Sequence, residues 1–245
     1  MRFKYARVSN SITFKPIFLR KYKLKELKEY PPEIPVVQFG MYTKTDYQFV
    51  NTRQGRVLVI WRGTDATRIN KKRKNILKKN NIRNISIGKF ISEDLTRWGI
   101  PFKEIPVSAT ELNISCEPRG DKIYCYGGYN KEIVDEVEKR LDIEIIRTNH
   151  KTFSREELMN AYKECFIGLR LTDHDGLPNT VMELGLMGRK SIYNGGTPHS
   201  IPWVGVDDIC ESIKKEYELR HEDNRQIHKD IFDFLNIHTK FLHYA

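Results

Sequence analysis

The sequence predicts an α/β protein made of two Rossmann-like domains, the first of them small. Short apolar runs typical of buried strands alternate along the chain with amphipathic, helix-like segments, which is the pattern of parallel sheets. A stretch rich in turn-forming residues, Pro101–Asn113, interrupts this alternation. With 245 residues, the chain is long enough for two cores. We therefore expect domains at residues 1–107 and 108–215, followed by a helical tail at 216–245.

The first domain is expected to alternate strands with helices. Its predicted strands are Ile34–Phe39, Arg56–Trp61 and Asn84–Phe90. Its predicted helices are a basic one at Lys71–Lys79 and a short one at Ile91–Trp98, with Ser92 as N-cap. Because each strand precedes a helix, a mainly parallel sheet follows.

The second domain shows the same alternation more clearly. Its predicted strands are Lys122–Tyr126, Ile143–Arg147 and Glu164–Leu171, and its predicted helices are Lys131–Leu141 and Arg155–Tyr162, the latter capped by Ser154. After the third strand, the turn Asp175-Gly176 leads into a helix that begins near Asn179 and ends at Gly188. Pro178 suits the first turn of that helix, where its missing N–H costs nothing.

The strand, turn and helix around Asp175 form the most informative stretch of the chain. A helix that starts at the carboxyl end of a buried parallel strand directs free N–H groups at a ligand crevice, an arrangement suited to phosphate. Asp175 and Glu183 are separated by seven residues, and carboxylates so placed can accept hydrogen bonds from sugar hydroxyls. Asp-Gly is also an ordinary turn, and a Glu early in a helix often only complements the helix dipole.

The segment DGLPNTVMELGLMG resembles the donor-binding signature of retaining GT-B glycosyltransferases that use sugar nucleotides. Their signature begins with Glu, so Asp175 is a departure, whereas Glu183 matches. The donor-binding positions implied by the resemblance are Gly176, Leu177, Pro178, Asn179 and Thr180. The likeness extends through Tyr193–Trp203 and Val206–Lys215 and is loose in the first half of the chain.

The resemblance implies a GT-B-like enzyme with a reduced first domain. It would transfer a hexosyl or related group from a nucleotide-diphosphate sugar to an acceptor hydroxyl, with retention of configuration and without a metal or other cofactor. Asp175 and Glu183 are then the catalytic candidates. In some relatives a loop similar to Trp61–Ala66 lines the acceptor side, so Gly63, Thr64 and Asp65 are candidates to line it here. Asp65 is also the candidate base if the reaction inverts the configuration. Helix capping by Thr64 or Asp65 explains the same residues equally well.

Cations that would neutralise the departing diphosphate are not where the family usually has them. The loop after Lys122–Tyr126 lacks the expected Arg and offers only Lys131. Arg147 and Arg170, near the ends of the next two predicted strands, are the substitutes. Arg170 has an alternative explanation as an ion-pair partner of a neighbouring aspartate.

The chain is basic, with a net charge of +10 and a dense cluster between Arg68 and Arg83. Such a face attracts nucleic acid, an acidic membrane surface or an anionic glycan, although a basic run is usually a solvated helix face. The four cysteines and seven histidines show no metal-site spacing, so we expect no bound metal. Without a visible signal peptide or membrane span, we expect a cytoplasmic protein, either free or peripheral at a membrane surface.

Three functions from different classes are compatible with the sequence. The first is a glycosyltransferase acting on a glycan, lipid-linked or protein acceptor. The second is a glycosyltransferase, for example a viral one, that modifies nucleic-acid bases and whose basic face would follow phosphates. The third is a non-catalytic module that binds sugar nucleotides or glycans. Asp in place of Glu at position 175 and the missing Arg favour this alternative.

Overall fold

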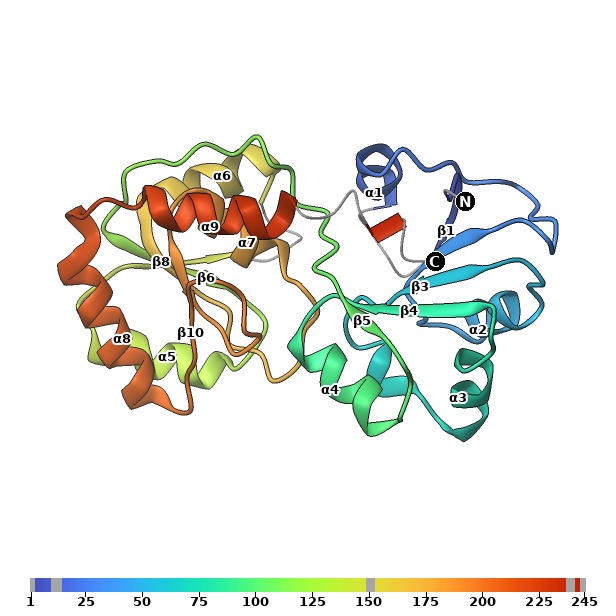
Figure 1. Ribbon diagram of the computed structural model, residues 1–245. Helices are drawn as coiled ribbons and strands as arrows, with labels where there is room; N and C mark the ends of the chain where they lie inside the picture. Colours follow the sequence, from blue (N-terminus) through green and yellow to red (C-terminus); the bar gives the residue numbers. More distant parts are fainter. Residues whose placement is uncertain (1–2, 10–14, 149–152, 237–240, 243–245) are drawn as a thin grey trace. The chain divides into compact units, whose positions relative to one another are not determined.

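The computed structural model describes residues 3–9, 15–148, 153–236 and 241–242 and has an α/β fold with two parallel sheets (Figure 1). The chain divides into two compact units, each built on one sheet. Unit 1 comprises Met1–Ala109, His174–Leu177 and Leu235–Ala245, and unit 2 comprises Thr110–Asp173 and Pro178–Phe234. Unit 1 therefore includes two short segments from later in the chain. The sequence predicted the first of them, His174–Leu177, within the second domain, and the second, Leu235–Ala245, within the helical tail.

Unit 1 has a sheet of five parallel strands in the order of the sequence. They are β1 (Tyr5–Val8), β2 (Val36–Phe39), β3 (Val57–Ile60), β4 (Ile82–Ser86) and β5 (Lys103–Glu104). β2 and β3 are buried at every position, as expected for a sheet that is covered on both faces. The helical segments of this unit are α1 (Lys15–Lys21), α2 (Lys44–Asn51), η1 (Ala66–Arg68), α3 (Lys71–Leu77) and α4 (Lys89–Arg97).

Neighbouring residues of β2 show how the helices of unit 1 cover both faces. Phe39 stacks on Phe18 of α1, with ring centroids 5.0 Å apart. The side chain of Gln38 accepts a hydrogen bond from Arg7, which also pairs with Asp46 of α2 at 2.7 Å. Because successive side chains of a strand point to opposite faces, α1 and α2 lie on opposite sides of the sheet (Figure 1).

Unit 2 has a second sheet of five parallel strands, but their order is not that of the sequence. The strands are β6 (Lys122–Tyr126), β7 (Ile145–Thr148), β8 (Cys165–Leu169), β9 (Lys190–Ile192) and β10 (Ser200–Ile201), arranged β10-β9-β8-β6-β7. The connection after β6 leads to one side of that strand, and the later strands lie on its other side. The sheet therefore changes winding direction between β6 and β8, which is where open α/β sheets bind ligands.

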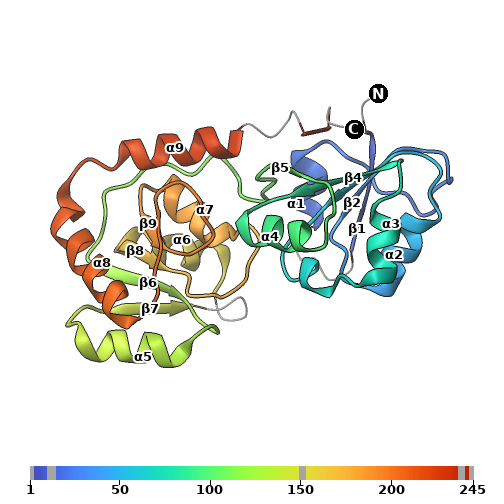
Figure 2. The same cartoon turned by 60° about the horizontal axis from the view of Figure 1, so that its bottom comes forward.

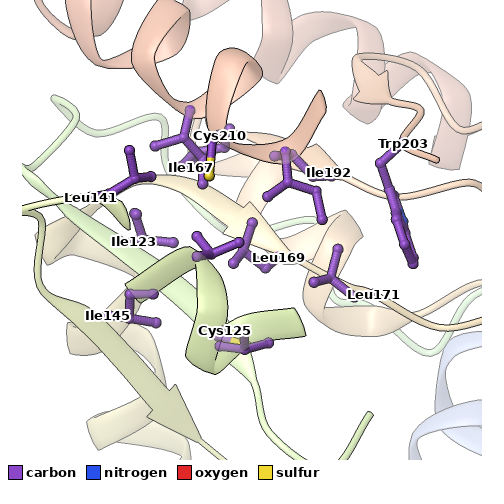
Figure 3. Close-up of a cluster of buried hydrophobic side chains, with 14 of the residues drawn as sticks. Ile123, Cys125, Leu141, Ile145, Ile167, Leu169, Leu171, Ile192, Trp203 and Cys210 are labelled. Atoms are coloured by element: carbon purple, nitrogen blue, oxygen red, sulfur yellow. The ribbon is translucent and has the colours of Figure 1, made fainter. Parts of the chain in front are cut away.

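Helices cover both faces of the unit 2 sheet. They are α5 (Lys131–Arg140), α6 (Arg155–Glu164), α7 (Asn179–Leu186), α8 (Val206–Glu218) and α9 (Arg225–Asn236), with the short η2 (Leu219–His221) after α8. α5 and α8 lie on one face, and α6, α7 and α9 lie on the other (Figure 2). Apolar residues of α5, α8 and the sheet form one core cluster, with Trp203 at its end beyond Leu171 and Ile192 (Figure 3). Among the described residues, no helix has both the length and the apolar character needed to cross a bilayer.

Several predicted elements differ from the observed ones in their bounds. α4 begins at Lys89 with Gly88 as N-cap, so the prediction that Ser92 caps this helix is wrong. The Ser92 hydroxyl instead donates to Ser86 at 2.9 Å and also contacts Glu104. Pro178 is the N-cap of α7 and not part of its first turn. By contrast, Ser154 caps α6 through a complete capping box, as predicted.

The predicted helical tail is only partly within the described residues. α8 and α9 account for most of it up to Asn236, and residues 237–240 and 243–245 lie outside the described part of the chain. Phe241 packs edge-on against Tyr22 of unit 1, with centroids 5.0 Å apart. The described end of the tail thus belongs to the core of unit 1.

Candidate functional site

The change of winding direction in unit 2 brings the loops after β6 and β8 together. The loop after β6 contains Gly127 and Gly128, and a Cβ atom at Gly127 would lie 2.9 Å from the carbonyl oxygen of Thr148. Gly128 has φ +115°, which L-residues with a side chain rarely adopt. Asn130 follows in the left-handed conformation, and its side-chain amide donates to the carbonyl of Leu171 at 3.0 Å. This bond ties the two loops to each other.

Arg170 is held at this edge by aromatic rings. Its guanidinium carbon lies 4.3 Å from the ring centroid of Tyr126 and 5.0 Å from that of Tyr129. The two rings are stacked, with centroids 6.1 Å apart. Stacking fixes the plane of a guanidinium while its N–H groups stay directed outward within that plane. Arg170 therefore presents an oriented cation beside the Gly127-Gly128 loop.

The other two predicted cations are placed differently. Arg147 forms ion pairs with Asp135 at 2.5 Å and Glu138 at 2.6 Å, both on α5. Its charge is thus already balanced by two carboxylates of the same unit. Lys131 is the exposed first residue of α5 and lies three residues after Gly128. The two ion pairs of Arg147 thus hold β7 and α5 together.

The start of α7 supplies a further polar surface at the same edge. Pro178 is the N-cap and makes no side-chain capping bond, and the Asn179 side chain accepts from the hydroxyl of Thr110 at 3.3 Å. The Thr180 hydroxyl is buried and has no hydrogen-bond partner within the part of the chain that the structure describes. Because unsatisfied buried hydroxyls are rare, this atom is positioned to bond a ligand or a water molecule.

Glu183 lies in the second turn of α7 and is almost fully buried. Its Oε1 pairs with the Arg155 guanidinium at 2.7 Å, and its Oε2 accepts from the hydroxyl of Tyr162 at 3.1 Å. Burial raises the pKa of Glu183 above its ordinary value, while the positive charge of Arg155 opposes that rise. Glu183 is thus a buried carboxylate that pairs with an arginine.

The segment His174–Leu177, which carries Asp175 and Gly176, packs within unit 1. A Cβ atom at Gly176 would lie 2.0 Å from the carbonyl oxygen of Arg62 and 3.2 Å from the side chain of Ile87. A Cβ at Gly88 would lie 3.3 Å from the Gly176 carbonyl oxygen. Only glycine fits at position 176, because the loop lies directly on the backbone that follows β3 and β4.

Side chains on both sides of Gly176 fix this loop. His174 bonds through Nε2 to the buried carboxylate of Asp94 at 2.8 Å, and its ring lies 5.7 Å from that of Phe90. Asp175 accepts from the N–H of Gly176 at 2.8 Å and interacts electrostatically with Arg62. The first acid of the predicted signature is therefore held beside a positive charge of unit 1.

Asp65 is fully buried in the loop that follows β3. Its Oδ1 accepts from the N–H of Gly63 at 2.9 Å, and its Oδ2 accepts from the N–H of Met41 at 3.0 Å. The N–H of Arg62 also reaches both oxygens. Burial raises the pKa of Asp65 to about 6 despite these bonds. With both oxygens engaged by backbone donors, the carboxylate joins the ends of β2 and β3, and Thr64 is the exposed side chain of this loop.

The predicted site residues thus fall into two groups. Unit 1 brings together Gly63, Asp65, Asp175 and Gly176, with Thr64 at the surface. Leu177 also belongs to unit 1, and the remaining predicted residues belong to unit 2. Among the described residues, no cluster of three His, Cys, Asp or Glu side chains could hold a metal ion.

Sequence reasoning missed the residues that hold the predicted ones in place. These are Arg62, Asp94, Tyr126, Tyr129, Asn130, Arg155 and Tyr162. The Ser154 capping signal located the start of α6, but nothing in the sequence pairs Arg155 with Glu183.

No family model and no curated protein matches the sequence. Several solved structures resemble the fold, among them these three. Sucrose-phosphate synthase from Thermosynechococcus elongatus has a TM-score of 0.63 at 12% identity, covering 91% of this chain and 71% of that chain. A point mutant of S. aureus TarM, in complex with fondaparinux, alpha-GlcNAc-glycerol and UDP, has a TM-score of 0.59 at 13% identity, covering 85% of this chain and 55% of that chain. The Gap123 complex from Streptococcus agalactiae has a TM-score of 0.50 at 11% identity, covering 88% and 53%.

These likenesses concern the fold. The chain has the GT-B-like fold of glycosyltransferases, with two Rossmann-like units, as the sequence predicted. It spans only a little more than half the length of TarM. That TarM structure contains UDP, a nucleoside diphosphate.

Proposed function

We propose that the protein is a glycosyltransferase that moves a sugar from a nucleotide-diphosphate sugar to an acceptor hydroxyl. The observation that carries this proposal is the carboxyl edge of the unit 2 sheet at the change of winding direction. Arg170 and the Gly127-Gly128 loop lie at this edge, and α7, which carries the buried Glu183, follows the strand β8 that ends there. The fold shared with TarM and sucrose-phosphate synthase supports it.

Unit 2 has groups that would bind the diphosphate and the ribose of the donor. Arg170 and the first-turn amides of α7 would hold the diphosphate, since an oriented guanidinium and free N–H groups are the usual ligands of phosphate oxygens. The Thr180 hydroxyl is available for a further bond at the same place. Glu183 would accept hydrogen bonds from the two ribose hydroxyls. Lys131 would add positive charge from the surface of α5.

We propose that the configuration at the anomeric carbon is retained. In this scheme the departing diphosphate takes the proton of the acceptor hydroxyl, and Arg170 and Lys131 stabilise its charge, so that the reaction needs no metal ion. The bonding of Asp65 supports this choice over inversion, because a carboxylate with both oxygens bound to backbone N–H groups is poorly placed to act as a base. Gly63, Thr64 and Asp175 remain the predicted contacts for the sugars.

We further propose that the acceptor, or the surface that carries it, is anionic. Residues 1–109 contain 24 Lys and Arg against 8 Asp and Glu, whereas residues 110–245 contain 18 against 24. The first range therefore carries a net charge of +16 and the second −6. Such a field attracts negatively charged partners at low salt. A glycan, lipid-linked or protein acceptor met in the cytoplasm fits this proposal, whereas the nucleic-acid and non-catalytic alternatives gain no support from the neighbouring folds.

Donor hydrolysis tests the proposed activity without knowledge of the acceptor. The protein is incubated with UDP-, GDP- and ADP-sugars, and the released nucleoside diphosphate is measured by chromatography. We expect slow release from one donor, and NMR of the freed sugar should show the anomer of the donor. If no donor in the panel is hydrolysed, or if wild type and Glu183→Gln hydrolyse it equally, the proposal is refuted.

A further inference from the structure

Glu183 is held by two neighbours of very different exposure. Tyr162 is buried, its ring packs edge-on against Tyr124 at 4.8 Å, and the Tyr124 hydroxyl bonds Thr148 at 2.6 Å. Oε2 of Glu183 therefore faces a rigid, buried group of hydroxyls. Oε1 faces Arg155, whose side chain is 50% exposed while that of Glu183 is 7% exposed.

The ion pair between Arg155 and Glu183 links the start of α6 to α7. Arg155 is the first residue of α6, directly after the capping Ser154, so its backbone is fixed by the capping box. Its guanidinium reaches across to α7 and binds Oε1 at 2.7 Å. A carboxylate oxygen has lone pairs beyond the one used here, so Glu183 can still accept hydrogen bonds from a ligand.

We propose that Arg155 is a positioning residue of the donor site, which orients Glu183 and keeps it ionised so that it selects a ribose with both hydroxyl groups. This inference rests on the proposed function, in which Glu183 receives the ribose. A neutral Glu183 would present a hydroxyl donor in place of one acceptor and would no longer match two adjacent sugar hydroxyls. The ligand class that Arg155 favours is thus a ribonucleoside diphosphate over its 2′-deoxy counterpart.

The charges around Glu183 give this role a pH signature. Burial raises the pKa of Glu183, Arg155 and the Tyr162 hydroxyl lower it, and Glu111 raises it. Without Arg155, the pKa of Glu183 rises further. Ribose recognition in an Arg155 variant should therefore be weaker than in wild type, and the difference should shrink as the pH is raised.

The test compares Arg155→Ala, Arg155→Lys and the control Lys163→Ala, which removes an exposed cation from the same helix. Binding of UDP, GDP and ADP and of their 2′-deoxy forms is measured by calorimetry, with circular dichroism as the check of folding. For the nucleotide that wild type binds, we expect Arg155→Ala to weaken binding of the ribose form about tenfold, as loss of one charge-assisted hydrogen bond implies, and to weaken binding of the 2′-deoxy form less. The loss should shrink at higher pH, and Arg155→Lys should restore part of the affinity.

Two results would overturn the inference. One is equal weakening of the ribose and 2′-deoxy forms, which would mean that Arg155 acts on the diphosphate. The other is an Arg155→Ala, or an Arg155→Gln if the alanine variant does not fold, that binds both forms as wild type does. If wild type binds none of the six nucleotides, the proposed function fails and the inference falls with it, an outcome distinct from the other two.

Discussion

Replacing Gly176 by alanine should dislodge the loop that carries the first acid of the signature. The added Cβ would lie 2.0 Å from the carbonyl oxygen of Arg62 and 2.8 Å from its carbonyl carbon, whereas real contacts of this kind stay above 3.0 Å. Both are backbone atoms next to β3, so the loop must move. Overpacking of this type costs about 2–3 kcal/mol, and at this chain length about 4–12 °C in melting temperature.

Differential scanning fluorimetry measures the effect, with Gly205→Ala as the matched control. Gly205 has nothing within 4 Å of its Cβ position and caps α8, so its replacement should cost less than about 1 kcal/mol. A Gly176→Ala protein that melts with wild type, or no lower than the control, would show that the loop does not pack as described.

Three further predictions test the placement of charged groups. Arg189 is buried and donates to backbone carbonyls, including those of Tyr162 and Cys165. Arg189→Met should therefore lower the free energy of unfolding, measured by chemical denaturation, by more than ~3 kcal/mol. Arg189→Lys should recover little of this loss, because an ammonium cannot reproduce the guanidinium's hydrogen bonds. An equally stable methionine variant would contradict this. The pKa of Asp65 rises on folding from 3.8 to about 6, so the folded state binds a proton more readily than the unfolded state. The stability of wild type relative to Asp65→Asn should therefore fall as the pH rises from about 4 to about 6, by at most ~3 kcal/mol, and a flat or rising difference would refute it. Arg170→Ala should weaken donor binding about tenfold in calorimetry, and Arg147→Ala less than about twofold, because Arg147 is neutralised by carboxylates of α5; the reverse order would exclude Arg170 as the phosphate ligand.

The second half of the fold is largely predictable from the sequence. The apolar run Lys122–Tyr126 is β6 with the same bounds, and Ser154 marks the start of α6 as expected. These elements carry uninterrupted apolar runs and a strong cap, so local preferences and the tertiary fold agree. β1, α1 and α2 are not predicted, because their apolar residues alternate with charged and polar ones. The capping box of α2, from Thr43 to Asp46, is the local signal that could have located that helix.

The identity of the site residues is more predictable than their surroundings. Burial of Asp65 depends on N–H groups from the ends of β2 and β3, and the pairing of Glu183 with Arg155 joins residues 28 positions apart. Such contacts arise from strand order and helix packing, which leave no local trace in the sequence. Similarly, Arg147 and Arg170 look equivalent as residues at strand ends. Their contacts differ in the structure, where Arg147 pairs with carboxylates of α5 and Arg170 lies against the rings of Tyr126 and Tyr129.

The most direct test of the donor site is a thermal-shift panel of nucleotide-diphosphate sugars against wild type and Glu183→Gln. A ligand present at ~100 times its dissociation constant stabilises the folded state by about 2.7 kcal/mol, which is a shift of roughly 5–10 °C at this size. We predict that one donor shifts wild type by this amount and leaves the folded Glu183→Gln protein unchanged. If no sugar nucleotide shifts wild type, or if both proteins respond alike, the carboxyl edge of the unit 2 sheet is not a donor site.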